Sequence, residues 1–275
     1  MKKHIVDLSK WNNKMNWPLA ASQIELAICR VQYGSNLVDH LYNDHIANLE
    51  KYGIPHGAYA YGCFVSVADA IVEAKDFLKR VNPNAKFLVL DVEDDTVKSM
   101  KSKGNLNDLA KASQAFIDTC RAAGWKVGFY VAHHMYGDYN LQGVQADFIW
   151  LPRYGTNNGT PQKKPSYPCD IWQYTDNGYI GGIGKVDINL LQGDKTLEWY
   201  IGTQVSNEPV RIKTGGFKDI VAAKELLEYA MVRKWWVEPF LSEGEFHYIT
   251  GGLYEPDASE FENWMKEHGW WCEKV

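Results

Sequence analysis

Acidic side chains follow an apolar segment in the sequence KFLVLDVEDD, residues 86–95. Alternate residues of a strand share a face, so Phe87, Val89, Asp91 and Glu93 point the same way. Asp91 and Glu93 are then about 6.6 Å apart along the strand. Like charge and partial burial raise the pKa of at least one such carboxyl group. A carboxylic acid that keeps its proton can protonate a leaving oxygen while its partner stabilises a developing cation, which is the chemistry that cleaves glycosidic bonds.

Two further aspartates belong to other predicted strands. Asp7 lies in HIVDLS near the start of the chain, and Asp187 lies in KVDINLL. In a closed parallel barrel the first and last strands are neighbours, and the carboxyl ends of the strands form the reaction face. We therefore expect Asp7, Asp91, Glu93 and Asp187 to meet at one mouth.

Other side chains near strand ends are predicted to surround this mouth. They are Tyr61, Tyr130, Trp172 and Gln173. Arg153, in LPRYG, either pairs with a carboxylate or caps the barrel. Asp94 and Asp95 are assigned to a helix N-terminus or a solvated turn. One of His133 and His134 can enter the mouth, but neighbours in a strand face opposite ways, so we predict no metal site and no cofactor.

Strands and helices alternate along the first part of the chain. The predicted strands are 4–9, 26–34, 56–62, 86–93, 126–134, 148–154, 170–175 and 185–191. Helical patterns separate the early strands at 17–25, 41–53, 67–81 and 105–124, with a short fifth helix at 135–143. Alternation predicts parallel pairing, and eight strands in about 190 residues favour an α/β barrel smaller than the usual ~250 residues. The last three strands are joined by loops, one of them GYIGGIG at 178–184.

A second region is predicted to begin at residue 207, within the linker VSNEP, so that the domains are 1–206 and 207–275. The motif TGG recurs after 36 residues, and the pair Trp-Trp recurs after 35. Each repeat has the pattern of strand, helix and strand, and two repeats make a small α+β domain of βαββαβ order. One tryptophan of each pair should face inward, so we expect Trp236 and Trp271, or their neighbours, to be partly exposed.

Composition excludes several classes of protein. The chain has 29 basic and 34 acidic residues, a net charge of -5 that disfavours binding to nucleic acid. No apolar segment approaches the ~20 residues of a membrane span, and no apolar signal core follows the first lysines. Five scattered cysteines do not suggest a disulfide framework. Residues 207–275 hold 8 basic and 13 acidic residues, so the whole net charge of -5 belongs to them.

The motifs DLSKWN, LVLDVED, FIWLPRYG and IWQYTDNGYIGGIGKVDINLL resemble, in order and spacing, the glycoside hydrolase family 25 lysozymes. These are the muramidases common among phage endolysins, and the resemblance covers roughly residues 1–195. It implies a (β/α)₅β₃ barrel that cleaves the β-1,4 bond between N-acetylmuramic acid and N-acetylglucosamine. It also implies that Glu93 is the general acid, that Asp91 assists at the anomeric carbon, and that Asp7 and Asp187 support them.

The second region resembles the wall-binding domains of Bacillus-type phage lysins. The implied partners are bacterial peptidoglycan and, in addition, a secondary wall polymer bound through Trp236 and Trp271. The implied location is the host cytoplasm until the membrane is breached. Two alternatives stay open: another carbohydrate-active barrel, such as a chitinase-like enzyme or a metal-dependent deacetylase, and a non-catalytic wall-binding protein. Chitinase-like barrels usually have a longer DxxDxDxE motif, and Phe87 and Val89 occupy its earlier positions here.

Overall fold

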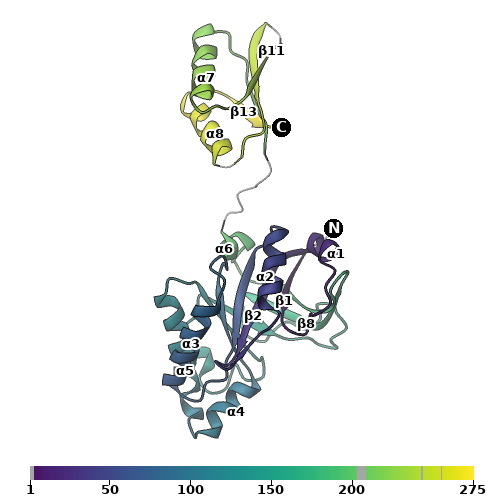
Figure 1. The fold of residues 1–275 in the computed structure, drawn as a ribbon, viewed down its shortest axis with the longest axis vertical. Helices are drawn as coiled ribbons and strands as arrows, with labels where there is room; N and C mark the ends of the chain where they lie inside the picture. Colours follow the sequence, from purple (N-terminus) through teal and green to yellow (C-terminus); the bar gives the residue numbers. More distant parts are fainter. Residues whose placement is uncertain (1–2, 203–208, 243, 255) are drawn as a thin grey trace. The chain divides into compact units, whose positions relative to one another are not determined.

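The computed structural model of the chain describes residues 3–202, 209–242, 244–254 and 256–275. It divides into two compact units, Met1–Gly202 and Thr203–Val275 (Figure 1). The predicted domain boundary between 206 and 207, with most of the predicted linker, lies outside the described residues.

The first unit is built on a sheet that closes on itself. Within the described residues the strand order is β1-β9-β8-β7-β6-β5-β4-β2-β3, and the pairing of β1 with β2 joins the ends of an eight-stranded ring. The strands are β1 (His4–Leu8), β2 (Ile24–Tyr33), β3 (Leu37–Val38), β4 (His56–Tyr61), β5 (Leu88–Val92), β6 (Val127–Val131), β7 (Phe148–Pro152), β8 (Ile171–Ile180) and β9 (Gly184–Leu191). All eight predicted strands are present, and the prediction of a closed α/β barrel is confirmed. The two-residue β3 was not predicted.

Helices connect the early strands. They are α1 (Trp17–Ala20), α2 (Tyr42–Lys51), α3 (Val67–Arg80), α4 (Asp94–Ser102), α5 (Leu109–Ala122) and, after the barrel, α6 (Leu197–Ile201). The predicted helix at 135–143 is wrong, because only Leu141–Gly143 forms a 3₁₀ turn there. Tyr139 and Asn140 have positive φ, a conformation through which a right-handed helix cannot continue.

The direction of β9 differs from the expected all-parallel barrel. β8 continues to Ile180, and a turn leads directly into β9, so most of the predicted loop at 178–184 belongs to a hairpin. A hairpin reverses the chain, and β9 is therefore antiparallel to both β8 and β1. Its amino end, not its carboxyl end, lies at the mouth of the barrel.

The barrel interior is filled by aromatic and aliphatic side chains. Phe87 and Val89 are buried there, as their shared face predicted. Phe87 packs edge-on against Phe148, with ring centroids 5.2 Å apart. A Cβ atom at Gly57 or Gly128 would lie 2.4 or 2.2 Å from these rings, so only glycine fits at either position. The interior is a packed core, and the space for a ligand is confined to the mouth.

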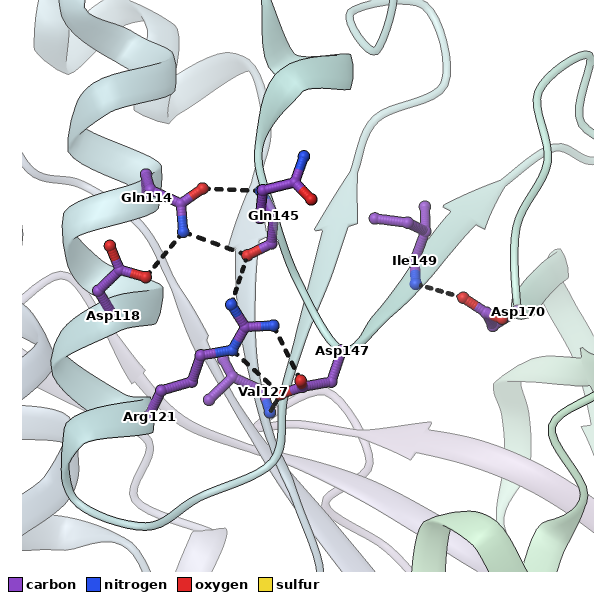
Figure 2. A network of polar contacts seen from close by, with 8 residues as sticks. All are labelled: Gln114, Asp118, Arg121, Val127, Gln145, Asp147, Ile149 and Asp170. Atoms are coloured by element: carbon purple, nitrogen blue, oxygen red, sulfur yellow. Dashed lines mark hydrogen bonds and ion pairs between the residues drawn. The ribbon is translucent and has the colours of Figure 1, made fainter.

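Aspartates fix the register where strands begin (Figure 2). Asp147, just before β7, accepts a hydrogen bond from Val127 N at 2.7 Å and pairs with Arg121 of α5 at 2.8 Å. Asp170, just before β8, accepts one from Ile149 N at 2.8 Å. Each carboxylate therefore ties the start of one strand to its neighbour, at the end of the barrel remote from the mouth.

The second unit has the order strand, helix, strand, strand, helix, strand. Its elements are β10 (Ile212–Thr214), α7 (Ile220–Val232), β11 (Val237–Ser242), β12 (Glu245–Thr250), α8 (Asp257–Glu267) and β13 (Cys272–Lys274). The sheet order among described residues is β11-β12-β10-β13. Trp236 is 70% exposed and Trp271 is 56% exposed, whereas Trp235 and Trp270 pack against the core. The predicted exposure of Trp236 and Trp271 is confirmed.

In neither unit does a described helix have both the length and the apolar character needed to span a membrane.

Candidate active site

The four predicted carboxylates line one cavity of about 200 Å³ at the mouth of the barrel. Asp7 comes from β1, Asp91 from β5, Glu93 from the residue before α4, and Asp187 from β9. Asp187 reaches the mouth because β9 is antiparallel, and it lies directly opposite Asp7 in the ladder. The full lining is Asp7, Tyr59, Asp91, Glu93, Tyr130, Trp150, Tyr154, Gln173, Asp176 and Asp187.

Amide side chains hold Asp7 in place. Asn189 Nδ2 donates to Asp7 Oδ2 at 2.8 Å, and Gln173 Nε2 donates to the same oxygen at 3.1 Å. Gln173 is itself oriented, because its Oε1 accepts hydrogen bonds from Tyr130 Oη at 3.0 Å and Tyr154 Oη at 2.6 Å. Every donor at Asp7 is therefore fixed by a further hydrogen bond or by the strand that carries it.

Burial and mutual repulsion keep protons on this cluster. Burial raises the pKa of Asp187 to about 9, with the charge of Asp7 as the next cause. Burial also raises the pKa of Asp7, while hydrogen bonds from Asn189 and Gln173 oppose the rise. Asp7 is thus the better anion of this pair, and Asp187 retains the proton.

The second pair, Asp91 and Glu93, is poised for proton transfer. Burial, and then the charge of Asp94, raises the pKa of Glu93 to about 7. Burial, and then the charges of Glu93 and Asp7, raises the pKa of Asp91 well above its usual range, while Arg30 opposes the rise. Contact between the two carboxyl groups raises the pKa of Asp91 further and lowers that of Glu93, so the pair holds a proton that the two groups can exchange. Among the described residues, the buried Asp91 Oδ1 has no hydrogen-bond partner and is free to accept one from a ligand.

The raised pKa of Asp187 predicts a stability that depends on pH. The folded chain binds this proton more tightly than the unfolded chain, whose aspartate has the ordinary pKa of 3.8, so stability falls as pH rises from about 4 to about 9. Asp187→Asn resembles the protonated form at every pH. We expect its Tm at pH 8 to exceed that of the wild type by several degrees, with the difference vanishing near pH 4.

Thermal unfolding followed by circular dichroism at pH 4, 6 and 8 measures this difference. Asp118→Asn, which changes an exposed carboxylate on α5, is the matched control and should leave the pH dependence unchanged. A lower Tm for Asp187→Asn at pH 8 would contradict the assignment of a raised pKa.

The predicted substrate-binding residues divide into two groups. Tyr130 and Gln173 line the cavity. Tyr61 does not line it but stacks on Tyr33 with centroids 4.6 Å apart, and burial together with the charges of Glu93 and Asp91 raises its pKa. Tyr130 and Gln173 thus lie in the cavity, and a role in binding substrate stays a prediction for all three.

Trp172 and Arg153 are corrections to the predicted site. Trp172 is buried on the outer face of β8, where its Nε1 donates to Arg153 O at 2.7 Å. Because neighbours in a strand point to opposite faces, Gln173 excludes Trp172 from the mouth. The Arg153 side chain donates to Lys164 O at 3.1 Å and to Ser166 Oγ, so it anchors a loop and neither lines the cavity nor pairs with its carboxylates.

Neither histidine of strand β6's extension lines the cavity. His133 Nε2 accepts a hydrogen bond from Ser166 N at 3.0 Å, and His134 Nε2 lies 3.2 Å from Asp94 Oδ1. Across the described ranges, no three histidine, cysteine or acidic side chains are grouped so that they could hold a metal ion.

Sequence reasoning missed part of the lining. The missed lining residues are Tyr59, Trp150, Tyr154 and Asp176. Asn189, which reaches the site through its hydrogen bond to Asp7, was missed as well. Strand alternation carries a signal for Tyr59, two residues before Tyr61, and for Asn189, two residues after Asp187. Asp176 carries no such signal, because it depends on the unpredicted extension of β8.

A second cavity of about 410 Å³ adjoins the first and shares Asp7, Asp176 and Asp187 with it. Trp11 and Lys185 also line this cavity. The indole of Trp11 is 77% exposed, so a flat apolar surface stands beside the carboxylates. The mouth therefore extends from the carboxylates to the exposed indole of Trp11.

The first unit is similar to known proteins. The profile of the family described as Glycosyl hydrolases family 25 matches residues 6–183. The lysozyme of Streptococcus phage Cp-1 is 32% identical over 141 residues, which cover 48% of this chain but only 40% of that relative.

Two solved structures are similar to the first unit. The catalytic domain of endolysin ply40, from bacteriophage P40 of Listeria monocytogenes, is 33% identical with a TM-score of 0.64, and the match covers 70% of this chain and 95% of that one. GHIP, a glycosyl hydrolase 25 of Streptococcus pneumoniae, is 26% identical with a TM-score of 0.65, over 72% of this chain and 92% of that one.

Proposed function

Because the chain belongs to glycosyl hydrolase family 25, we propose that it hydrolyses bacterial peptidoglycan as a lysozyme. The bond cleaved is the β-1,4 bond between N-acetylmuramic acid and N-acetylglucosamine. The observation that carries the proposal is the cavity in which Asp91 and Glu93, both with raised pKa, face the pair Asp7 and Asp187. The name lysozyme for the phage relative and the name endolysin for the Listeria phage structure support the same activity.

The proposed reaction needs two proton transfers at Glu93. Glu93 donates its proton to the glycosidic oxygen as the bond to the anomeric carbon breaks. The carbonyl oxygen of the substrate's own 2-acetamido group attacks that carbon, while Asp91 accepts a hydrogen bond from the acetamido N–H. A water molecule then gives a proton back to Glu93 and adds to the anomeric carbon, which releases the acetamido group. This is a substrate-assisted variant of the two-carboxylate scheme, and the unpartnered Asp91 Oδ1 supports it.

Digestion of purified peptidoglycan tests the proposed bond. The fragments are reduced with borohydride and identified by mass spectrometry. Reduced muramic acid ends, with acetyl groups and peptides intact, are the expected result. Reduced glucosamine ends, loss of acetyl groups or free peptides would each identify a different bond and overturn the proposal, and uncut material would leave only a wall-binding protein.

The finer layout of the two units is also part of the proposal. Among the described residues α-helices follow β1, β2, β4 and β5, and β7, β8 and β9 are joined without α-helices, so the proposed (β/α)₅β₃ arrangement has only the 3₁₀ turn Leu141–Gly143 in its fifth helical place. We assign the second unit to binding the cell wall, in the manner of phage lysins from Bacillus hosts. The exposed tryptophans Trp236 and Trp271 support that role.

Trp11 is predicted to bind a sugar ring beside the cleaved bond. Its exposed indole lines the cavity that adjoins the carboxylates, and the apolar face of a pyranose ring can stack on an indole. We expect Trp11→Ala to raise KM by about 10-fold with little change in kcat, because the contact is made in both ground and transition states. Kinetics on soluble glycan fragments measure this.

A matched control is Leu19→Ala, which removes an exposed apolar side chain outside both cavities. It should leave KM unchanged. If Trp11→Ala lowered kcat alone, Trp11 would act in the chemical step and the stacking role would be wrong.

A further inference from the structure

The two repeats of the second unit are equivalent down to single hydrogen bonds. Gly215 N donates to Trp271 O, and Gly251 N donates to Trp236 O, both at 2.8 Å. Each Thr-Gly-Gly segment therefore pairs with the Trp-Trp segment of the other repeat, not with its own.

The same exchange relates other contacts. Thr214 Oγ1 accepts from Tyr248 N at 3.0 Å, and Thr250 Oγ1 accepts from Ile212 N at 2.8 Å. The bridges Val210 to Leu253 and Phe217 to Phe246 exchange in the same way after a shift of 36 residues. The central strands β10 and β12 are antiparallel, so an approximate two-fold axis passes between them.

Inner and outer tryptophans have different roles. Trp270 packs edge-on against Phe217 at 5.1 Å, and Trp235 Nε1 donates to Asp257 Oδ2 at 3.0 Å, so the inner pair holds the fold together. The outer pair, Trp236 and Trp271, leaves most of each indole in water. A single exposed tryptophan needs no explanation, but two at equivalent positions of a repeat are not required by the core.

Each outer tryptophan lies next to a glycine of the other repeat. A Cβ atom at Gly251 would lie 3.2 Å from Trp236 Cβ, and one at Gly215 would lie 3.5 Å from Trp271 Cβ. Glycine is also required at residue 216, because a Cβ atom there would collide with the side chain of Glu245. Each outer tryptophan and the neighbouring glycine of the other repeat together form an exposed platform.

A cavity of about 560 Å³ adjoins the Trp271 platform. It is lined by Gly215, Gly216, Lys218 and Glu245 among others, and Lys218 Nζ lies 3.1 Å from Glu245 Oε1. A flat apolar ring beside paired donors and acceptors suits a sugar, which has an apolar ring face and polar edges. Residues 207–275 carry a net charge of -5, which disfavours phosphate-rich polymers and favours an uncharged glycan as the ligand.

We propose that the second unit binds glycan at two exposed tryptophans in corresponding places of the repeat. Trp271 lies beside the cavity lined by Lys218 and Glu245, and Trp236 has Tyr254 and Pro209 at the corresponding positions. The proposal deepens the wall-binding part of the proposed function and rests on it. Strands β11 and β13, next to which the platforms lie, are three strand spacings apart, or about 14 Å. Two-fold symmetry gives the sites opposite directions, so one directed glycan strand cannot bind both alike. Two neighbouring glycan strands of the wall can each bind one site, and the unit then holds the two glycan strands together.

The test uses the full chain with Glu93→Gln, so that the wall is not digested during the measurement. The probe is purified sacculi treated with hydrofluoric acid to remove phosphate-containing polymers. Co-sedimentation gives the apparent affinity of this background and of Trp236→Ala, Trp271→Ala and the double variant. The matched control is Val232→Ala, which shortens an 80% exposed side chain of α7 away from both platforms.

Each single variant should bind at least about 10-fold more weakly, because loss of one site removes the gain from two-point attachment. The double variant should be retained only as weakly as the mouth of the barrel allows, and the control should bind as the background does. Soluble glycan fragments should titrate three sites in the background, one of them the mouth of the barrel, and two in each single variant. If one single variant bound like the background, or if acid treatment abolished all binding, the proposal would be overturned.

The outcome is separable from that of the proposed reaction. Cleavage of soluble glycan fragments is measured in parallel on the chain that keeps Glu93, and Val232→Ala is the variant that should leave its rate unchanged. Normal cleavage with undiminished wall binding would reject the two sites alone, whereas two-site binding without cleavage would reject the lysozyme reaction alone. Circular dichroism of each variant verifies the fold.

Discussion

Glu93→Gln should lower kcat by about 10³-fold or more while leaving the barrel folded. Glutamine has the size of glutamate but cannot deliver a proton to the leaving oxygen, and general acid catalysis contributes roughly 10²–10⁴-fold. Burial raises the pKa of Glu93 to about 7, so a neutral side chain at this position removes an unfavourable charge at higher pH. The loss of activity should therefore come without loss of stability, as measured by peptidoglycan turnover and thermal unfolding of the same preparation.

The neighbouring variant Asp94→Asn is the matched control. It keeps the acid but removes the charge that, after burial, contributes most to the raised pKa of Glu93. Its kcat at pH 5 should be near that of the wild type, and its activity should decline at a lower pH, because Glu93 must be protonated to act. If Glu93→Gln retained a tenth of the wild-type rate, another group would be the acid.

The strand that carries Asp91 was fully predictable from its residues. The apolar run of β5 and the two-residue spacing of its carboxylates specify a buried strand, an inward face and an acidic end. The same reasoning placed Asp7 correctly, because Ile5 on its face is part of the inner core. Local periodicity was enough in both cases, since burial on both sides of a barrel strand leaves its register little freedom.

Asp187 reached the predicted place for a different reason. The sequence suggested one more parallel strand, but β8 runs ten residues and returns as a hairpin. The length of a hairpin depends on pairing between two strands, which no single segment reveals. The same limit hid Asp176 and made Trp172 and Gln173 appear equally suitable, although only one of them can face the cavity.

Helix α4 was missed because its sequence, DDTVKSMKS, is strongly polar and has only Val97 and Met100 as apolar side chains. Its stability comes from tertiary contacts: Thr96 is buried, accepts from Glu93 N at 3.2 Å and donates to Gly62 O at 2.6 Å. Helix propensity alone could not show this. Glu93 is the N-cap of this helix, so the start of the helix fixes the backbone of the proposed acid.

The repeat of the second unit was visible in the sequence, but the pairing of each repeat with segments of the other was not. A spacing of 36 residues predicts two similar units, and either intra-repeat or inter-repeat pairing satisfies it. The structure pairs each Thr-Gly-Gly with the Trp-Trp of the other repeat, through the long-range pairing of β10 with β13 and the hairpin of β11 with β12. The composite platforms follow from that choice.

Asp91→Asn should lower kcat/KM by about 10²–10³-fold on a substrate that carries the 2-acetamido group. Asparagine keeps the shape of the side chain but loses the negative charge that stabilises the positive acetamido intermediate. Asp91 Oδ1 is buried without a partner among the described residues, so a ligand N–H is the contact that this oxygen lacks. The variant should fold normally, because burial already disfavours the charge that the substitution removes.

A substrate with a 2-hydroxyl in place of the acetamido group allows a thermodynamic cycle, in which the enzyme and the substrate are each changed alone and together. The wild type should cleave that substrate slowly, and Asp91→Asn should reduce the rate little further, because the two changes remove the same interaction. Equal losses on both substrates would mean that Asp91 acts independently of the acetamido group, as a nucleophile or a water-orienting base. The coupling between substitution and substrate therefore decides between the assisted route and a mechanism in which the protein supplies both carboxylates.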